Sequence, residues 1–258
     1  MSDWNPSLYL KFEEGRNKPI YDLIAHIPVM QPKRIIDIGC GPGNSTAPLA
    51  KMYPGVEIIG IDSSPSMIAK AKKEYPDMEW MVFDANRDLS DFGSFELVFT
   101  NSVLHWLPDH ERLLPRLFGL LSENGVFAAQ IPYFLGTPIY EPLYALIQNE
   151  KWDKYFLNKQ PTTYRDIGFY YDILSSHFSE FDLWTTKYTH VLHARSDMME
   201  WYKPTAFKAL TDQLDTEELK ELFLSDVWPI VNDLYHPQKD GKYLFRFEHF
   251  FFVARRTE

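Results

Sequence analysis

Three glycines at alternate positions are the first residues of this chain whose spacing suggests chemistry. Gly39, Gly41 and Gly43 lie in the run DIGCGPGNST at 37–46. Glycine lets the backbone turn sharply and approach a ligand without a Cβ collision. A helix is expected after the loop, with Asn44 or Ser45 as its cap, and the amino terminus of a helix favours a carboxylate or phosphate. The loop therefore predicts a site for a small molecule with an anionic group.

Two cofactor classes compete for this loop. A dinucleotide site usually has the pattern G-x-G-x-x-G, and here Asn44 stands at the sixth position. Asp37 followed by G-x-G-x-G instead resembles motif I of methyltransferases that use S-adenosylmethionine. The loop alone leaves both classes open.

Polar residues after the next three predicted strands favour the methyl donor. Asp62 lies 19 residues past Gly43, where an acidic side chain can accept both ribose hydroxyls of either cofactor. Asp84 follows the third strand, where methyltransferases commonly bind the adenine amino group, and Asn101 ends the fourth, where they line the methyl-transfer point. Each acid alone could be an ordinary turn or cap residue, but together they lie at the edge where open α/β sheets bind ligands. The expected S-adenosylmethionine-binding residues are Asp37, Gly39, Gly41, Gly43, Asn44, Asp62, Ser63, Met67, Asp84, Ala85 and Asn101.

The elements that must position these residues alternate between short apolar runs and helical patterns. This alternation predicts an α/β fold, a doubly wound, Rossmann-like, seven-stranded mixed sheet. After the second strand, Ser63 or Ser64 can cap a helix with Pro65 in its first turn. The later chain, at 138–178 and 196–236, has helical patterns rich in aromatic residues. The predicted strands are 34–38, 57–61, 79–83, 97–101, 125–131, 181–193 and 243–254.

One domain, residues 1–258, is expected, with a helical cap over the active site from about 1–30 and 196–236. The formal net charge of −10 argues against a nucleic-acid surface, because phosphate binding needs a basic stripe. Cys40 is the single cysteine, and the amino terminus lacks the pattern of a signal peptide, so a cytoplasmic protein without a membrane span is expected. No cluster of metal ligands is recognised. A monomer or a small homo-oligomer is expected.

Six segments along the chain match one family of enzymes, and they are DWNPSLYLKF at 3–12, DIGCGPGNST at 37–46, GIDSSPSMI at 60–68, LHWLPDH at 104–110, YYDIL at 170–174 and LWTTKYTHVL at 183–192. In these segments the chain resembles the trans-aconitate 2-methyltransferase family, within the class I methyltransferases. The resemblance implies methyl-ester formation on a small carboxylic acid, with S-adenosylmethionine as donor. A carboxylic acid with a pKa near ~4 is already ionised at neutral pH, so no catalytic base is expected.

The acceptor site departs from the family pattern in two places. Tyr133 and Phe134 replace the Asp-Asn that follows strand five, and Lys208 stands where the family has arginine, which grips carboxylates with a bidentate fork. The candidate substrate-positioning residues are Tyr9, His105, Trp106, Lys208 and Arg246. Each has a structural alternative: packing for the two aromatic residues, a satisfied core position for the histidine, and a solvated surface for Lys208 and Arg246.

Two other functions remain open at this stage. The acceptor could be another carboxylate, for example a diacid linked to an acyl-carrier protein, which the bulky Tyr133 and Phe134 make worth considering. Alternatively, the chain could bind the cofactor without turnover and act as a regulator or scaffold. The intact glycine loop and its acidic partners argue against a loss of cofactor binding.

Overall fold

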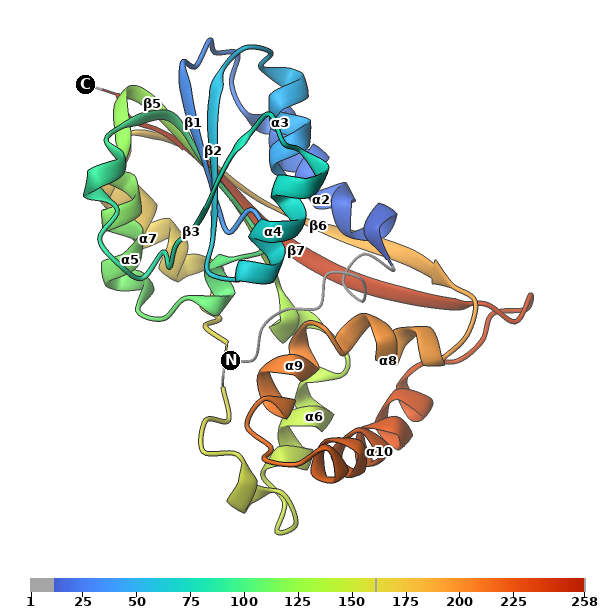
Figure 1. Ribbon diagram of the computed structural model, residues 1–258. Helices are drawn as coiled ribbons and strands as arrows, with labels where there is room; N and C mark the ends of the chain where they lie inside the picture. The colour runs from blue at the N-terminus through green and yellow to red at the C-terminus, as the bar shows by residue number, and fades with distance from the viewer. Residues whose placement is uncertain (1–11, 161, 258) are drawn as a thin grey trace. The chain divides into compact units, whose positions relative to one another are not determined.

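A computed structural model describes residues 12–160 and 162–257 (Figure 1). Seven strands form one sheet in the order β3-β2-β1-β4-β5-β7-β6. The first five pair in parallel, and β7 runs antiparallel to β5, so the predicted mixed Rossmann-like sheet is confirmed. The strands are β1 Arg34–Ile38, β2 Glu57–Asp62, β3 Glu79–Val82, β4 Phe95–Asn101, β5 Leu121–Pro132, β6 Glu180–Leu192 and β7 Tyr243–Arg255.

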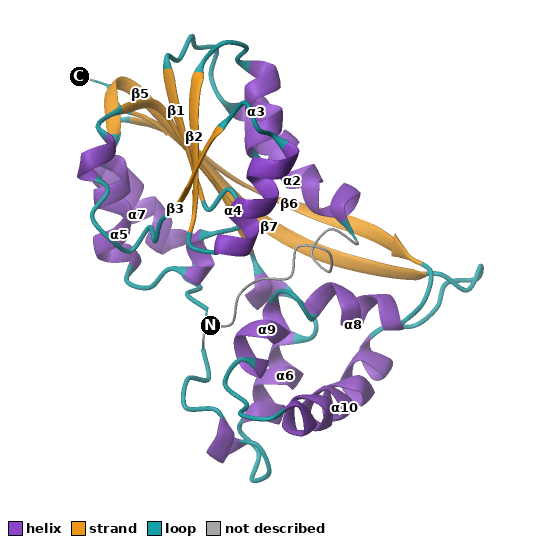
Figure 2. Ribbon diagram, in the orientation of Figure 1, coloured by secondary structure: helices purple, strands orange, loops and turns teal. Residues whose placement is uncertain are grey.

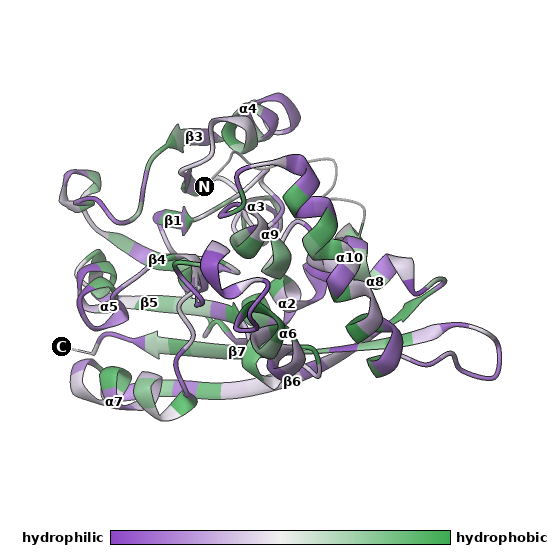
Figure 3. Ribbon diagram, turned by 90° about the horizontal axis from the view of Figure 1, so that it is seen from below, coloured by the Kyte–Doolittle hydropathy of each residue, from purple (hydrophilic) through white to green (hydrophobic). Residues whose placement is uncertain are grey.

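The central strands are apolar because both of their faces are covered. Every residue of β1 after Arg34 is buried, and β5 is buried from Gly125 to Ile131. Figure 3 shows hydrophobic residues along much of β5 and β7. Continuous apolar runs of this kind are typical of strands in the middle of a parallel sheet. Strand β5 starts earlier than predicted because Leu121 pairs with Phe95, beyond a polar stretch that resembles a turn.

Helices cover both faces of this sheet, as Figures 1 and 2 show. Helices α2 (Glu13–His26), α3 (Thr46–Met52) and α4 (Pro65–Glu74) lie on one side. Helices α5 (His110–Phe118) and α7 (Ile167–His177) lie on the other. Short 3-10 turns connect several elements; they are η1 Ser90–Phe92, η2 Leu104–Trp106, η3 Phe134–Gly136 and η4 Asp153–Tyr155.

The two helix caps predicted from the sequence have different outcomes. At α4, the Ser64 hydroxyl accepts a hydrogen bond from the Met67 amide at 3.2 Å, and Pro65 is in the first turn, as expected. At α3, Ser45 stands at the N-cap position but makes no capping bond. Its hydroxyl donates to the buried Asp37 at 2.6 Å. Ser45 therefore occupies one of the two predicted cap positions without the capping bond that was expected of it.

The described chain divides into two compact units. We call residues 12–132, 163–185 and 249–257 the sheet unit, and residues 133–160, 162 and 186–248 the helical unit. The helical unit contains α6 (Tyr140–Ile147), α8 (Ser196–Tyr202), α9 (Ala206–Thr211) and α10 (Glu217–Leu234). Its core includes Trp152, Phe156 and Phe223, whose rings pack within about 5–6 Å of one another.

The helix-rich segments predicted at 138–178 and 196–236 are present, but α7 belongs to the sheet unit. Helix α2 also belongs to the sheet unit, where His26 stacks on Trp184 of β6 with ring centroids 4.0 Å apart. Residues 133–160 group with the helices of 196–236. The expectation that helices cover the active site stays a prediction.

Candidate functional site

The glycine loop adopts backbone angles that require glycine. Gly39, Gly41 and Gly43 have φ values of +73°, +55° and +97°. A Cβ added at Gly39 would lie 2.1 Å from a methyl carbon of Val103, and one at Gly43 would lie 2.8 Å from the Tyr75 ring. At Gly41 no atom of residues 12–160 and 162–257 lies within 4 Å of an added Cβ. Packing therefore explains two of the glycines, and at Gly41 the backbone is left open to a ligand.

Asp37 lies at the base of this loop and is fully buried. Its Oδ2 accepts hydrogen bonds from Ser45 Oγ at 2.6 Å and Thr46 Oγ1 at 2.7 Å. Its Oδ1 is also buried, and it has no hydrogen-bond partner among the described residues. Burial raises the pKa of this carboxyl from 3.8 to about 6, although the two hydroxyls act in the opposite direction. An N–H donor beside Oδ1 would satisfy this oxygen and favour the ionised form.

Asp62 joins the end of β2 to the glycine loop. Its Oδ2 accepts from the Gly41 amide at 3.0 Å, and its Oδ1 accepts from the Ser64 amide at 2.8 Å. The carboxylate therefore fixes both the loop and the start of α4. The bonds to ribose hydroxyls that the sequence suggests stay a prediction.

The remaining predicted cofactor residues of the sheet unit lie around the same strand ends. Asp84 is two residues past β3, and its Oδ1 accepts from the backbone and side-chain nitrogens of Asn86, both at 2.9 Å. Ala85 and Met67 are buried, whereas Ser63 is exposed and Ser64 caps the helix in its place. Asn44 donates through Nδ2 to Asn17 of α2 at 3.4 Å.

A hydrogen-bonded chain that the sequence did not reveal crosses three strands at the end of β4. Ser102 has a left-handed backbone, with φ +59°, and its amide donates to the Gln130 carbonyl at 3.0 Å. Its hydroxyl donates to Gln130 Oε1 at 2.7 Å, and Gln130 Nε2 lies 2.5 Å from His249 Nδ1. The only sequence signal was one glutamine within the apolar run VFAAQIP. Polar residues in such runs require partners because burial without them is costly.

Asn101 directly precedes Ser102, the first residue of these hydrogen bonds, and it is partly exposed. Its Nδ2 donates to Ser102 Oγ at 3.5 Å, whereas its Oδ1 is buried and has no hydrogen-bond partner among the described residues. Asp37 and Asn101 lie on neighbouring strands, with Asp37 in register with Phe99. Because residues two apart on a strand share a face, these two oxygens lie on the same side of the sheet.

His105 cannot serve as a cationic partner for a carboxylate. The side chain is 5% exposed, and burial, with a smaller effect of His110, lowers its pKa to about 3. Its ring stacks on Tyr164 with centroids 5.9 Å apart and contacts Trp106. It is therefore neutral at physiological pH, and any contact with an acceptor would use a neutral ring.

His110 anchors the segment that contains His105 and Trp106. Its Nε2 bonds to the Leu104 carbonyl at 2.8 Å, so this nitrogen carries the proton. The Tyr170 hydroxyl then donates to Nδ1 at 3.0 Å. Two segments quoted above, 104–110 and 170–174, are thus joined by this buried contact. Burial lowers the pKa of His110.

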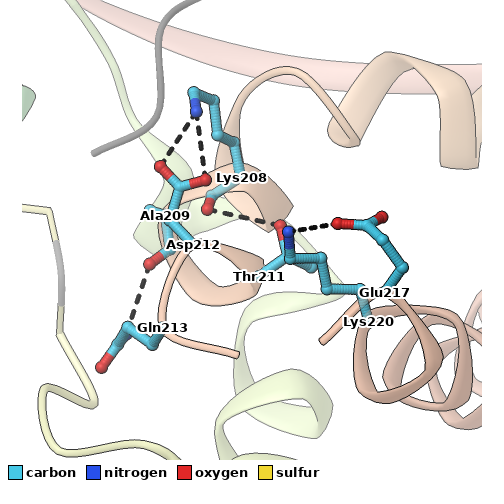
Figure 4. Close-up of polar contacts among 7 residues, drawn as sticks. All are labelled: Lys208, Ala209, Thr211, Asp212, Gln213, Glu217 and Lys220. Carbon is cyan, nitrogen blue, oxygen red and sulfur yellow. Dashed lines mark hydrogen bonds and ion pairs between the residues drawn. The ribbon is translucent and has the colours of Figure 1, made fainter. Parts of the chain in front are cut away.

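The other acceptor candidates lie elsewhere. In the helical unit, Lys208 is 9% exposed, and its ammonium lies 2.9 and 3.1 Å from the two oxygens of Asp212. Figure 4 shows the Lys208 side chain directed at the Asp212 carboxylate. The solvated surface position considered for Lys208 was wrong, because the pair is buried within the unit. Arg246 is exposed. Tyr9 lies outside the described residues.

Neither a helix able to span a membrane nor a cluster of metal ligands occurs among the described residues. No helix among them is long and apolar enough to cross a membrane. No group of three or more His, Cys, Asp or Glu within residues 12–160 and 162–257 is arranged to hold a metal ion. Cys40 is buried, and burial raises the pKa of its thiol, which disfavours the reactive thiolate.

Comparisons with known proteins agree with this geometry. A family profile for a methyltransferase domain matches residues 36–127. Trans-aconitate 2-methyltransferases from Shigella dysenteriae and Escherichia coli K12 are 38% identical over 258 residues, which is 100% of this chain and of each relative. Among solved structures, a phosphoethanolamine N-methyltransferase 2 from Haemonchus contortus in complex with S-adenosyl-L-methionine has a TM-score of 0.55 at 16% identity. The match covers 98% of this chain and 56% of that one. A coclaurine N-methyltransferase has a TM-score of 0.57 at 13% identity, covering 99% and 83% of the two chains.

The structural matches support the fold, and the full-length sequence matches identify the family. The motif around Asp37, the strand order and the loop geometry are those expected of a site for S-adenosylmethionine. The chain is an S-adenosylmethionine-dependent methyltransferase and belongs to the trans-aconitate 2-methyltransferase family.

Proposed function

We propose that this enzyme methylates one carboxylate of trans-aconitate and releases the monomethyl ester. The observation that carries the proposal is the 38% identity to trans-aconitate 2-methyltransferases across the full length of both chains. In this reaction a carboxylate oxygen forms a bond to the methyl carbon. The bond from that carbon to sulfur breaks, and its electron pair stays on sulfur, which leaves S-adenosylhomocysteine.

The residues of the sheet unit fit the methyl donor. The buried oxygens of Asp37 and Asn101 that have no partner among the described residues suit an N–H donor, such as the ammonium of the donor's methionine part. The open backbone at Gly41 suits the close approach of a ligand. Asp62 is positioned by the loop and by α4, at the strand end where a ribose is expected. The bound donor supplies an electrophilic methyl group, so the protein has mainly to position the acceptor.

The carboxylate acceptor needs little chemical activation by the protein. A carboxylic acid is ionised at neutral pH, so no side chain needs to remove a proton. His105, with a pKa of about 3, is a poor base at that pH. Catalysis would consist of placing the carboxylate oxygen in line with the methyl group and excluding water. We propose that Tyr9, His105 and Trp106 contribute to this placement.

The second candidate acceptor is a different carboxylic acid. Two features of the helical unit support this alternative. Lys208, which replaces the family arginine, is paired with Asp212, so its charge is already matched within the unit. Phe134 is buried against Tyr202, with ring centroids 6.0 Å apart. If residues 196–236 form the proposed helical cap, these differences would change the shape and charge offered to the acceptor.

A labelled-methyl assay tests the proposal. The enzyme is incubated with S-adenosylmethionine carrying a labelled methyl group and with trans-aconitate, cis-aconitate, citrate, or a diacid attached to an acyl-carrier protein. Formation of the labelled ester of trans-aconitate with the highest kcat/KM is expected. Transfer to another acid alone would contradict the proposed acceptor and retain the enzyme class. Cofactor binding without transfer to any acid would favour a regulator. The Asp62→Ala variant provides the background rate.

A further inference from the structure

The hydrogen-bonded chain from Asn101 to His249 has a defined direction. Gln130 is fully buried at the centre of this chain, between Ser102 on one side and His249 on the other. A glutamine amide has one end that only accepts and one end that only donates. Its Oε1 faces the Ser102 hydroxyl, and its Nε2 faces His249. The Ser102 hydroxyl therefore donates to Gln130, and His249 Nδ1 accepts from it.

This direction extends to Asn101. Since the Ser102 proton is used toward Gln130, Ser102 Oγ can only accept from its other neighbours. Asn101 Nδ2 donates to it at 3.5 Å, so the amide nitrogen of Asn101 faces Ser102. Its Oδ1, the buried oxygen that has no partner among the described residues, is left for a ligand. The Asn101 carboxamide could flip, so that its oxygen and nitrogen change places, only if the Ser102 hydroxyl proton rotated toward Asn101.

The position of Asn101 identifies the kind of ligand group. A Cβ added at Gly39 would meet Val103 at 2.1 Å, so the segment after β4 lies directly against the start of the glycine loop. Asp37 Oδ1, also buried without a partner among the described residues, is on the neighbouring strand and the same face. Two acceptor oxygens suit a group that carries several N–H donors and a positive charge. An ionised tricarboxylate carries neither N–H donors nor a positive charge.

We propose that Gln130 and His249 are positioning residues for the cofactor. Through Ser102 they hold the Asn101 carboxamide with its oxygen, rather than its NH₂ group, toward the ammonium of S-adenosylmethionine. The same contacts fix Ser102 in its left-handed backbone, a conformation that is unfavourable for a residue other than glycine without such support. This inference concerns the methyl donor and does not depend on the identity of the acceptor.

The tautomer of His249 in the ligand-free protein provides a direct test. Because Nδ1 accepts from Gln130, neutral His249 must carry its proton on Nε2. A long-range proton–nitrogen NMR spectrum distinguishes the two tautomers, and the spectrum of His249→Gln identifies the signals. The Nε2–H tautomer is expected in the wild type. A proton on Nδ1 in neutral His249 would reverse the donor and acceptor roles in the hydrogen bonds from Asn101 to His249 and overturn the proposal.

Two substitutions at Gln130 separate positioning from simple packing. Gln130→Met removes both hydrogen bonds and frees the Ser102 proton to turn toward Asn101. Gln130→Glu keeps an acceptor for Ser102, and His249 can provide the proton that the new carboxylate needs. By calorimetry, we expect Gln130→Met to weaken S-adenosylhomocysteine binding about tenfold, the effect of losing a hydrogen bond to a charged group. We expect Gln130→Glu to remain within about threefold of wild type.

Burial alone predicts the opposite order, since a buried carboxylate disturbs a core more than methionine does. Equal losses, or a larger loss for Gln130→Glu, would therefore contradict the proposal. The matched control is Thr100→Val, an isosteric change in β4 at a buried hydroxyl that has no hydrogen-bond partner among the described residues; it should leave the affinity unchanged.

The ammonium is tested with the analogue of S-adenosylhomocysteine that lacks the amino group. Wild type and Gln130→Met should bind this analogue equally, because the group that Asn101 recognises is absent. A loss of the same size for the analogue would show that Gln130 acts on another part of the ligand and would overturn the assignment.

Discussion

Burial changes the ionisation of Asp37, and this change connects stability with cofactor binding. The carboxyl has a pKa of about 6 in the folded chain, against an ordinary value of 3.8. Between these two values the folded state binds a proton that the unfolded state has lost, so the free energy of unfolding decreases as the pH rises. Above about pH 6 the free-energy cost of burying the ionised Asp37 carboxylate is complete, and it amounts to roughly 1–3 kcal/mol. A bound cation beside Asp37 would reverse part of it.

Asp37→Asn should therefore stabilise the ligand-free protein at neutral pH and weaken cofactor binding. Thermal denaturation across about pH 4.5–8 should show a gain of roughly 1–3 kcal/mol at the alkaline end and little at the acidic end. S-adenosylhomocysteine binding should weaken by about tenfold or more, because a charge-assisted hydrogen bond is lost. The exposed Asp77→Asn is the control for a change of net charge. A stability difference independent of pH would argue against the raised pKa.

Lys208 and Asp212 form a second buried charged group, and their coupling can be measured. The two side chains are 11% and 13% exposed, so removing either one takes an ion-pair partner from a charge that water reaches poorly. Asp212→Leu or Lys208→Met alone should reduce the free energy of unfolding by about 3 kcal/mol, and the double variant should recover much of it. Urea denaturation of all four proteins gives the coupling energy. Additive effects would show that the pair contributes little to the stability of the helical unit.

At the scale of elements, the segment after β4 depends on contacts with helix α7. His110 is buried as a neutral ring between the Leu104 carbonyl and the Tyr170 hydroxyl. Because burial lowers the pKa of His110, the unfolded state binds a proton that the folded state does not as the pH falls below about 6.5. The contribution of this contact to stability is therefore lost toward acid.

Tyr170→Phe removes the hydroxyl that donates to His110. We expect the free energy of unfolding to decrease by about 1–2 kcal/mol, because the buried Nδ1 loses its partner. The affinity for S-adenosylhomocysteine should change by less than about twofold, since the Tyr170 hydroxyl bonds to His110, which is not one of the predicted cofactor residues. Tyr171→Phe, at an exposed position of the same helix, is the control. A large loss of affinity with unchanged stability would place Tyr170 in the cofactor site.

At the scale of the whole molecule, the two compact units should respond to different ligands. The predicted cofactor residues all lie in the sheet unit, whereas Lys208 and Arg246 lie in the helical unit. S-adenosylhomocysteine should slow hydrogen exchange mainly in the peptides that contain β1, β2 and β4. Trans-aconitate added afterwards should slow exchange in residues 186–248 if these helices cover the acceptor. Protection confined to the sheet unit would contradict the proposed helical cap. Citrate serves as the control acid.

The local sequence was sufficient for the mixed sheet and for the class of the methyl donor. Strand β1 was predicted with its observed bounds because an apolar run ends at glycines, and such signals act between residues close in the chain. The cap of α4 at Ser64 was predicted for the same reason. The seven-stranded mixed sheet was predicted from the alternation of apolar runs and helical patterns, because that alternation is typical of a sheet covered by helices.

Only the tertiary structure decided how residues distant in the chain pair. The hydrogen bonds among Ser102, Gln130 and His249 span up to 119 residues, and although the apolar run around Gln130 indicates that it needs a partner, nothing local identifies that partner. Burial likewise made His105 neutral and gave Lys208 a carboxylate partner, although in sequence both resembled candidate ligands for a carboxylate. Sequence therefore determined the methyl-donor class, whose signals are local backbone requirements. The fold determined which side chains are charged, paired or oriented, because those properties depend on the surroundings that packing creates.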